Sequence, residues 1–251
     1  MNKRGQVSVF IILGIILVVI TVLLYYFRGS LFPGLPATPI ERRVADLNNY
    51  VESCIKEKGE EALSLIGKQG GSIKPSLYLD FKTDRINYLC YTDNYNSCFN
   101  KVPFLSEHVE NEIAKYVSEN LKDCVDLDDF RSKGYDVREE DYKVDVSIGD
   151  KSVIVNVDYP ITLVKGSYVE RGRRFSYTFD IVLGKILHIA EGIVDKEISN
   201  PLGVVFTQPI MALYRYKYEI SRWTYRNSEI YHIKERGKNF EFQFAIQNWV
   251  K

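Results

Sequence analysis

The stretch VSVFIILGIILVVITVLLYYF, residues Val7–Phe27, is an uninterrupted apolar run without a charged side chain. An α-helix rises 1.5 Å per residue, so about 20 apolar residues span the roughly 30 Å hydrocarbon core of a bilayer. The run therefore predicts one membrane span. Roughly 220 residues follow it, which is enough for one large domain or two small ones.

Basic residues flank the run on both sides, because Lys3 and Arg4 precede it and Arg28 follows it. Their balance alone does not fix the orientation of a span. The segment before the run is too short to form a folded domain, so we expect the N-terminus inside and the C-terminal region outside the cytoplasm. A cleaved secretory signal would need a shorter apolar stretch and a small-residue cleavage site, and Arg28-Gly29-Ser30 is a poor site of that kind.

The residues Lys3-Arg4-Gly5-Gln6-Val7-Ser8 lead directly into the apolar run. They resemble the class III signal of archaeal type IV pilin-like proteins, in which a prepilin peptidase cuts just before the apolar helix. The resemblance implies a cut between Gly5 and Gln6. Gln6 and Ser8 match the family pattern, whereas Phe10 stands where the family has a glutamate that helps subunits join a filament. The resemblance covers about the first 25 residues, and a plain signal anchor is the alternative interpretation.

The composition is typical of a folded protein, with 45% apolar and 26% charged residues. A net charge of zero gives no overall attraction to nucleic acid, so we expect no nucleic-acid partner. The charge is unevenly distributed: residues 104–151 contain 14 acidic and 7 basic side chains, and residues 203–251 contain 4 and 8. This asymmetry could bring two regions or two subunits together, although a solvated surface also explains it. The 18 tyrosines favour contact surfaces, since the ring packs while the hydroxyl stays wet.

The chain has four cysteines, Cys54, Cys90, Cys98 and Cys124. Outside the cytoplasm, an even number predicts disulfides. Cys90 and Cys98 bracket the turn-forming segment YTDNYNS, and the other two each lie on the apolar stripe of an expected helix. We therefore favour the pairs 90–98 and 54–124 over the two other pairings or free thiols. Structural zinc sites usually contain closely spaced cysteine pairs, whereas the spacings here are 36, 8 and 26 residues, so we expect no metal.

Hydrophobic periodicity predicts strands and helices in blocks, which is typical of an α+β fold with a mostly antiparallel sheet and about three helices after the membrane helix. We expect an N-terminal segment and span over 1–27, a linker over 28–38, a helix-hairpin-helix subdomain with the cysteines over 39–141, and a β-rich subdomain with one helix over 142–251. The expected helices cover about 39–66, 106–124 and 182–199, residues 126–141 form a polar connector, and the expected strands cover 77–81, 86–91, 142–148, 152–159, 161–165, 173–179, 214–223, 230–235 and 240–246.

The sequence contains none of the common catalytic or cofactor-binding motifs. The histidines, His108, His188 and His232, lie on different expected elements and not in a metal-ligand spacing. His188 and Glu191 are one helical turn apart, which we interpret as a surface pair. We expect no enzyme and no cofactor, although a Ser-His-acid site assembled from distant residues is recognised by geometry rather than by order.

Two charged clusters are candidates for binding. Arg171, Arg173 and Arg174, expected at the tip of a hairpin, form an anion patch able to grip phosphate or an anionic sugar, with solubility as the alternative explanation. The acidic residues within 126–129 and 139–141 could coordinate calcium, but they lack the alternating spacing around a central glycine. We favour a solvated connector for them.

These expectations define a single-pass membrane protein in contact with the lipid bilayer, whose extracytoplasmic domain contacts a protein partner or copies of itself. The resemblance of the N-terminus adds a pilin-like or cell-surface assembly subunit to this interpretation. The alternatives are an anchored extracellular ligand-binding protein or hydrolase without a recognisable motif, and a subunit of a membrane complex on the inner side with reduced cysteines.

Overall fold

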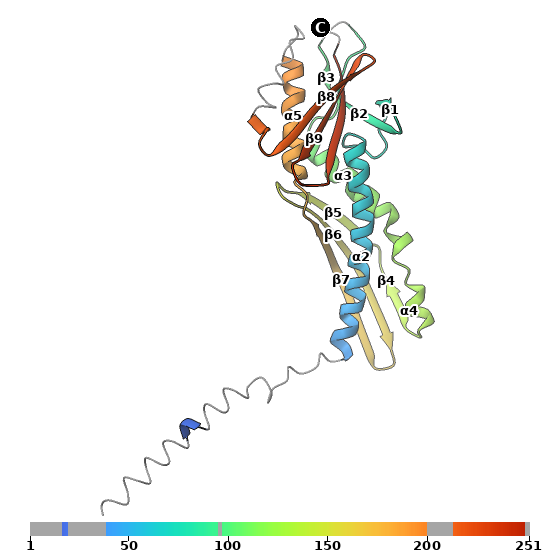
Figure 1. Ribbon diagram of the computed structural model, residues 1–251. Helices are drawn as coiled ribbons and strands as arrows, with labels where there is room; N and C mark the ends of the chain where they lie inside the picture. Colours follow the sequence, from blue (N-terminus) through green and yellow to red (C-terminus); the bar gives the residue numbers. More distant parts are fainter. Residues whose placement is uncertain (1–16, 20–38, 95–96, 200–212, 249–251) are drawn as a thin grey trace, which may run out of the picture. The chain divides into compact units, whose positions relative to one another are not determined.

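The computed structural model describes residues 17–19, 39–94, 97–199 and 213–248 (Figure 1). The processing site at Gly5 and Gln6, the linker over 28–38 and all of the apolar run except Leu17–Val19 lie outside these residues. In the described part of the chain, no helix is both long and apolar enough to cross a bilayer. The chain divides into two units, residues 1–43 and 44–251, and the second has a mixed α+β fold with two sheets.

One sheet has six strands, drawn from two distant parts of the chain. Its order is β1-β2-β10-β9-β8, with β3 added beside β2. β10 runs parallel to β2, whereas the other neighbouring strands are antiparallel. The strands are β1 (Tyr78–Phe81), β2 (Asp84–Tyr91), β3 (Phe99–Asn100), β8 (Tyr218–Tyr225), β9 (Ser228–Glu235) and β10 (Glu241–Gln247).

The other sheet has four strands that follow one another in the sequence. β6 is central: β7 pairs along one edge of it, and β5 and then β4 share the opposite edge. The register between β6 and β7 shifts between Asp158 and Ile161, around Pro160, which has no N–H group to donate to a ladder. The strands are β4 (Asp136–Glu139), β5 (Lys143–Ile148), β6 (Val153–Lys165) and β7 (Tyr168–Phe179).

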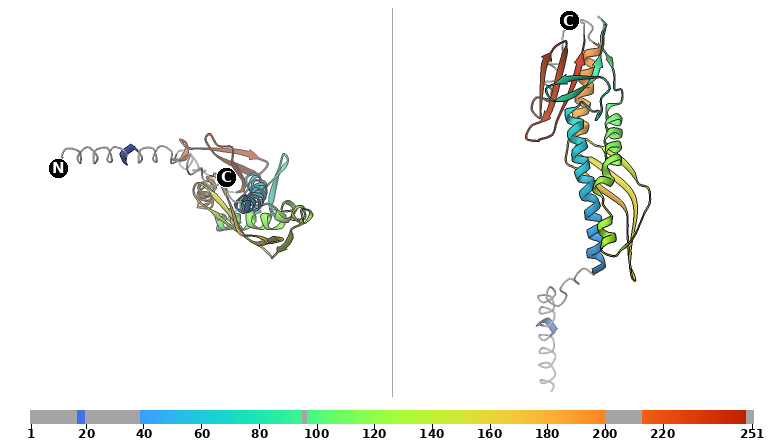
Figure 2. Two further views of the ribbon diagram at one scale, coloured as in Figure 1. Left: turned by 90° about the horizontal axis from the view of Figure 1, so that it is seen from below. Right: turned by 90° about the vertical axis from the view of Figure 1, so that its right-hand side faces the viewer.

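Three long helices pack on these sheets: α2 (Pro39–Lys68), α3 (Leu105–Cys124) and α5 (Leu183–Ser199). A β-carbon built on Gly59 of α2 would lie 2.4 Å from the ring of Phe179, so α2 passes very close to β7. α3 contacts β5, and α5 contacts β2, β3 and β9 (Figures 1 and 2). The buried side chains of α3 recur every fourth residue, which gives one apolar stripe. They are Leu105, Val109, Ile113, Val117 and Leu121.

The prediction that residues 126–141 form only a connector is wrong. The segment contains the short helix α4 (Asp128–Ser132) and strand β4, whose backbone pairs with the second half of β6. No side chain of β4 is buried, so its sequence lacks the alternation that identifies a half-buried strand.

The predicted position of the second hairpin turn is also wrong. β6 continues to Lys165 and β7 begins at Tyr168, so the turn consists of Gly166 and Ser167, with Gly166 at a positive φ of 60°. Arg171, Arg173 and Arg174 therefore lie within β7 rather than at a hairpin tip.

Both sheets take strands from both sides of the expected boundary at residues 141 and 142. β2 pairs with β10 across it, and β4 pairs with β6. A single hydrophobic cluster includes Leu47 and Ile113 from one side and Val155 and Phe242 from the other.

Candidate functional site

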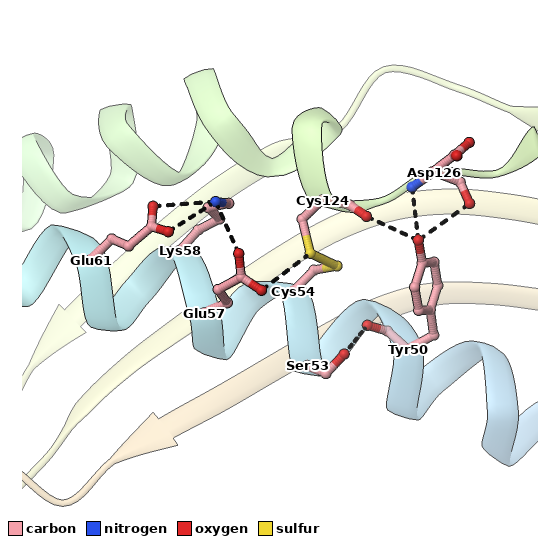
Figure 3. The surroundings of a disulfide bond; sticks show 8 residues. All are labelled: Tyr50, Ser53, Cys54, Glu57, Lys58, Glu61, Cys124 and Asp126. Atoms are coloured by element: carbon pink, nitrogen blue, oxygen red, sulfur yellow. Dashed lines mark hydrogen bonds and ion pairs between the residues drawn. A yellow bond between two sulfur atoms is a disulfide. The ribbon is translucent and has the colours of Figure 1, made fainter.

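Both disulfides that the sequence favours are present. Cys54 of α2 is bonded to Cys124 at the end of α3 (Figure 3). Cys90 is bonded to Cys98. All four cysteines of the chain are therefore in disulfides, and none is available as a thiol nucleophile or a thiolate ligand.

Tyr50 reinforces the first disulfide from one helical turn away. Its hydroxyl donates a hydrogen bond to the carbonyl oxygen of Cys124 at 2.9 Å and accepts one from the backbone N–H of Asp126 at 2.9 Å (Figure 3). The last carbonyls of a helix lack partners within it, so this hydroxyl satisfies the end of α3 and fixes the chain that follows.

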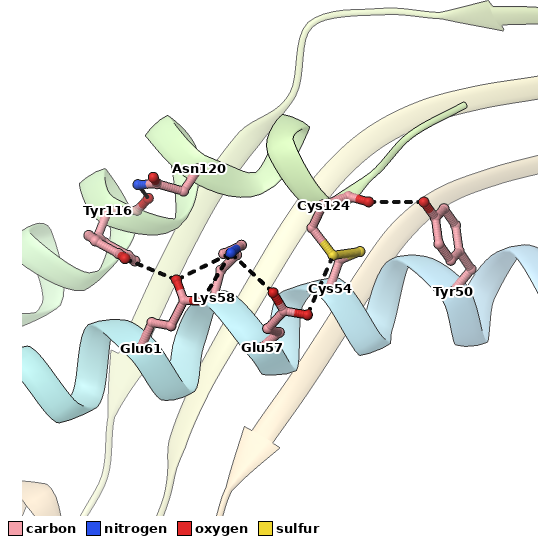
Figure 4. A network of polar contacts seen from close by, with 8 residues as sticks. All are labelled: Tyr50, Cys54, Glu57, Lys58, Glu61, Tyr116, Asn120 and Cys124. Atoms are coloured by element: carbon pink, nitrogen blue, oxygen red, sulfur yellow. Dashed lines mark hydrogen bonds and ion pairs between the residues drawn. A yellow bond between two sulfur atoms is a disulfide. The ribbon is translucent and has the colours of Figure 1, made fainter. Parts of the chain in front are cut away.

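A polar network continues along the same face of α2 (Figure 4). Lys58 Nζ lies 3.0 Å from Glu61 Oε1 and 3.1 Å from Glu57 Oε1, and the Tyr116 hydroxyl donates to Glu61 Oε2 at 3.0 Å. The hydrogen bond to Glu61 and then that to Glu57 raise the pKa of Lys58, and Lys58 in turn lowers the pKa of Glu61. Glu57, Lys58 and Glu61 all belong to α2, so the hydrogen bond from Tyr116 is the contact of this network that joins α2 to α3.

The structure brings together a serine and a histidine that are far apart in the sequence. Ser72 Oγ lies 2.8 Å from His108 Nε2, and Asn87 Nδ2 donates to Ser72 Oγ at 3.1 Å. In the histidine tautomer whose Nε2 carries no proton, the Ser72 hydroxyl donates to the imidazole while its oxygen accepts from Asn87. This is the relation between nucleophile and base in acyl-transfer enzymes, and no local motif indicates it in the sequence.

The surroundings of this pair do not suit acyl transfer. Ser72 is only 7% exposed. In hydrolases with a nucleophile elbow, the N–H of the residue after the nucleophile helps to stabilise the oxyanion. Here that N–H belongs to Ile73, and it donates to Glu112 Oε2 at 2.7 Å. A carboxylate therefore occupies the place that an oxyanion would need, and these bonds attach the loop after α2 to α3.

The arginine cluster predicted as an anion patch is exposed along β7. Arg173 Nε donates to Asp158 Oδ1 at 3.0 Å, and this hydrogen bond raises the pKa of Arg173. Arg174 is opposite Asp158 in the strand register, and Arg171 is opposite Thr162. An anion would therefore compete with Asp158 for the central arginine.

Three of the six acidic side chains considered for calcium, Asp128, Asp129 and Glu139, form ion pairs with basic side chains. Arg131 donates to Asp128 Oδ1 at 2.6 Å and to Glu139 Oε1 at 3.3 Å, and Lys133 donates to Asp129 Oδ2 at 2.6 Å. Within the described ranges, no group of three or more His, Cys, Asp or Glu side chains could hold a metal ion.

Glu191, predicted to form a surface pair with His188, instead reaches another helix. Its Oε1 accepts a hydrogen bond from the backbone N–H of Leu105 at 3.2 Å. Leu105 is the first residue of α3, and the preceding Phe104 makes no side-chain cap. A carboxylate at a helix N-terminus satisfies an unpaired N–H and interacts favourably with the dipole, so Glu191 has a structural role.

A buried polar cluster joins α5 to the six-stranded sheet. The Tyr231 hydroxyl donates to Glu197 Oε1, 2.8 Å away, and lies 3.2 Å from Glu229 Oε2, which is 3.5 Å from Arg222. Glu197 is 6% exposed, and burial raises its pKa above the ordinary value. The cluster ties α5 to β9.

The opposite face of the six-stranded sheet carries a second, smaller hydrophobic cluster. Its buried members are Leu79, Ile86, Tyr88, Ile230 and Ala245, and Leu77, Phe81, Tyr91 and Tyr225 are partly buried around it. Trp223, on the same face of β8 as Tyr225, is 48% exposed. Exposed aromatic groups that lie over a small apolar cluster are typical of contact surfaces.

Comparison of the chain with protein-family models, with curated proteins and with solved structures finds no match.

Proposed function

We propose that this chain is a single-pass membrane protein whose folded region lies outside the cytoplasm and works by contact with a protein partner or with copies of itself rather than by catalysis. The observation that carries the proposal is the pair of disulfides, one of which joins two helices of the core. Disulfides persist in oxidising compartments and are rare in the cytosol. The apolar run of residues 7–27 supplies the anchor.

Two further observations support a contact role. The Ser–His pair has its neighbouring N–H occupied by Glu112, which disfavours hydrolysis there. Aromatic side chains are partly exposed on one face of the six-stranded sheet, with Trp223 the most accessible of those on β8.

Thiol labelling of intact cells tests the compartment. We expect the four cysteines to react with a membrane-impermeant maleimide only after reduction, because all of them are in disulfides. Labelling of all four before reduction, or labelling that requires permeabilised cells, would place the domain inside and overturn the proposal.

The intact mass of protein extracted from membranes tests the pilin-like part separately. Loss of residues 1–5, with Gln6 as the new N-terminus, supports processing of the class III type. Retention of these residues supports a plain anchor and leaves the extracytoplasmic contact role standing.

A further inference from the structure

Two hairpin turns place a basic residue where glycine is the usual occupant. The turn between β1 and β2 is Lys82-Thr83, and the turn between β8 and β9 is Arg226-Asn227. Lys82 has a φ of 56° and Arg226 a φ of 51°, whereas the second residue of each turn does not have a positive φ. This pattern is typical of a type II′ turn, in which glycine normally takes the first position. A side chain at such a position costs conformational energy that glycine avoids.

The conformation puts each cation over the aromatic ring that precedes it. Lys82 Nζ lies 5.1 Å from the centre of the Phe81 ring, and Arg226 Cζ lies 5.2 Å from the centre of the Tyr225 ring. The Phe81 and Tyr225 rings meet edge to face, 5.1 Å apart, so the two turns form one surface. We call Phe81, Lys82, Trp223, Tyr225 and Arg226 the aromatic–basic patch.

The patch has the composition of a protein contact with a charge preference. Trp, Tyr and Arg are the residues that most often dominate binding energy at interfaces. Neither Lys82 nor Arg226 forms an ion pair with another described residue. Electrostatic complementarity therefore favours an acidic surface as the partner.

The segment of residues 123–141 carries eight acidic side chains and three basic ones, and it stays acidic after the basic ones pair with four of the carboxylates. We call it the acidic surface. Asp123, Glu140 and Asp141 are exposed, and among the described residues they too are outside every ion pair. The views in Figures 1 and 2 agree in placing α4 and β4 at the opposite end of the unit of residues 44–251 from the turn between β8 and β9. The patch therefore has no access to the acidic surface of its own chain.

We propose that the aromatic–basic patch docks onto the acidic surface of residues 123–141 of a second copy of this chain. The inference rests on the proposed contact function and names the partner and the surface. Because the two surfaces differ and lie at opposite ends, the contact is heterologous and can repeat from copy to copy.

Photo-crosslinking of the full chain in detergent tests the contact directly. A benzoylphenylalanine replaces Asn227, and copies labelled with ¹⁴N and ¹⁵N are mixed in equal amounts before irradiation. We expect crosslinked peptides that join residue 227 of one isotope to the segment 123–141 of the other. Crosslinks confined to one isotope, crosslinks to any other segment, or none would overturn the proposal.

Charge reversal tests the chemistry of the contact. Arg226→Glu should lower the mixed-isotope crosslink yield at least tenfold, whereas Lys196→Glu, the same charge change at an exposed position of α5, should leave it unchanged. Lys82→Glu/Arg226→Glu copies and Glu140→Lys/Asp141→Lys copies should each fail to crosslink alone. A mixture of the two variants should crosslink again, because the acidic patch of one variant then meets the basic side chains at positions 140 and 141 of the other. No recovery in the mixture, with both variants folded, would refute the charge pairing.

Glycine variants separate the contact from the fold. Lys82→Gly and Arg226→Gly relieve the positive-φ cost, so each should raise the melting temperature while it lowers the crosslink yield. A lower melting temperature would show that these side chains serve stability instead. If labelling confirms the compartment and the crosslinks fail, the proposed contact role stands and only this surface assignment falls.

Discussion

The two sheets are built in different ways, and so are the disulfides associated with them. The four-stranded sheet comes from the continuous segment 136–179, in which each strand pairs with a near neighbour in the sequence. The six-stranded sheet combines residues 78–100 with residues 218–247, through the parallel pair of β2 and β10. The four-stranded sheet is held together by pairing between strands that are close in the sequence. The two parts of the six-stranded sheet are joined by the long-range pairing of β2 with β10.

The disulfides show the opposite pattern. The bond between Cys54 and Cys124 joins residues 70 apart and links α2 to α3, whereas the bond between Cys90 and Cys98, within the six-stranded sheet, joins residues only 8 apart. The long-range covalent link therefore supports the helices beside the locally formed sheet. The non-local sheet depends on its own hydrogen bonds and core.

Removing the two disulfides one at a time should give the largest difference in unfolding free energy between the two regions. In the chain-entropy description, a bond across about 70 residues stabilises by about 4 kcal/mol and one across about 8 residues by about 2.5 kcal/mol. We therefore expect Cys54→Ala/Cys124→Ala to cost more unfolding free energy than Cys90→Ala/Cys98→Ala. Urea unfolding of the full chain measures both, and equal costs would contradict the comparison.

Gly67→Ala should be the next largest effect, because it tests the contact of α2 with the six-stranded sheet. A β-carbon on Gly67 would lie 2.4 Å from the carbonyl oxygen of Glu241 in β10. Overpacking of this kind costs about 1–3 kcal/mol. The matched control is Gly192→Ala in α5, where a β-carbon meets nothing within 4 Å. A helix gains about 0.5–1 kcal/mol from that change.

Thermal unfolding of the two alanine variants gives the sign of each effect. A lower melting temperature for Gly67→Ala and a higher one for Gly192→Ala would sharpen the assignment of the close contact to α2 and β10. A neutral Gly67→Ala would show that α2 can move away from the sheet without cost.

Glu197→Gln should give the smallest effect, one that depends on pH. Burial raises the pKa of Glu197 above its ordinary value of 4.5, so the folded state prefers the neutral carboxyl. The stability that this preference contributes is present below the ordinary pKa and is lost as the pH rises through the raised folded pKa. Glu229, Arg222, Tyr231 and Asn248 face this group.

We therefore expect wild-type protein to lose stability relative to Glu197→Gln as the pH increases from 4 to 7. Unfolding free energies at several pH values measure this difference. Glu60→Gln, an exposed residue of α2, serves as the control for the loss of one carboxylate. A difference that is constant with pH would show that Glu197 ionises without hindrance in the folded state.

Much of the local structure was predictable from the sequence. The stripe of α3 at every fourth residue, the apolar face of α5 and the hairpin around Gly149 and Asp150 all appear as expected. Both disulfide pairs could be favoured, because one spans a short turn and the other links two apolar stripes. β4 and the true turn at Gly166 and Ser167 were missed, since an exposed strand has no alternating pattern and a long hairpin ladder can pass through charged residues.

The candidate sites were much less predictable. Ser72 and His108 are 36 residues apart, and the partner of Ile73 is Glu112 on α3, so only packing brings these groups together. The aromatic–basic patch had a weak signal, an aromatic residue followed by a basic residue in two short turns. Nothing in the sequence indicated that Phe81 and Tyr225 would meet.

The sequence by itself determined the apolar run, the helices, most hairpins and the preferred disulfides, because each follows from periodicity, turn chemistry or spacing over a few residues. The tertiary structure alone decided that β2 pairs with β10, that Glu191 caps α3 and that two basic turns share one surface. These contacts depend on the closure of long loops, whose partners are selected by the shape of the common core rather than by any local pattern.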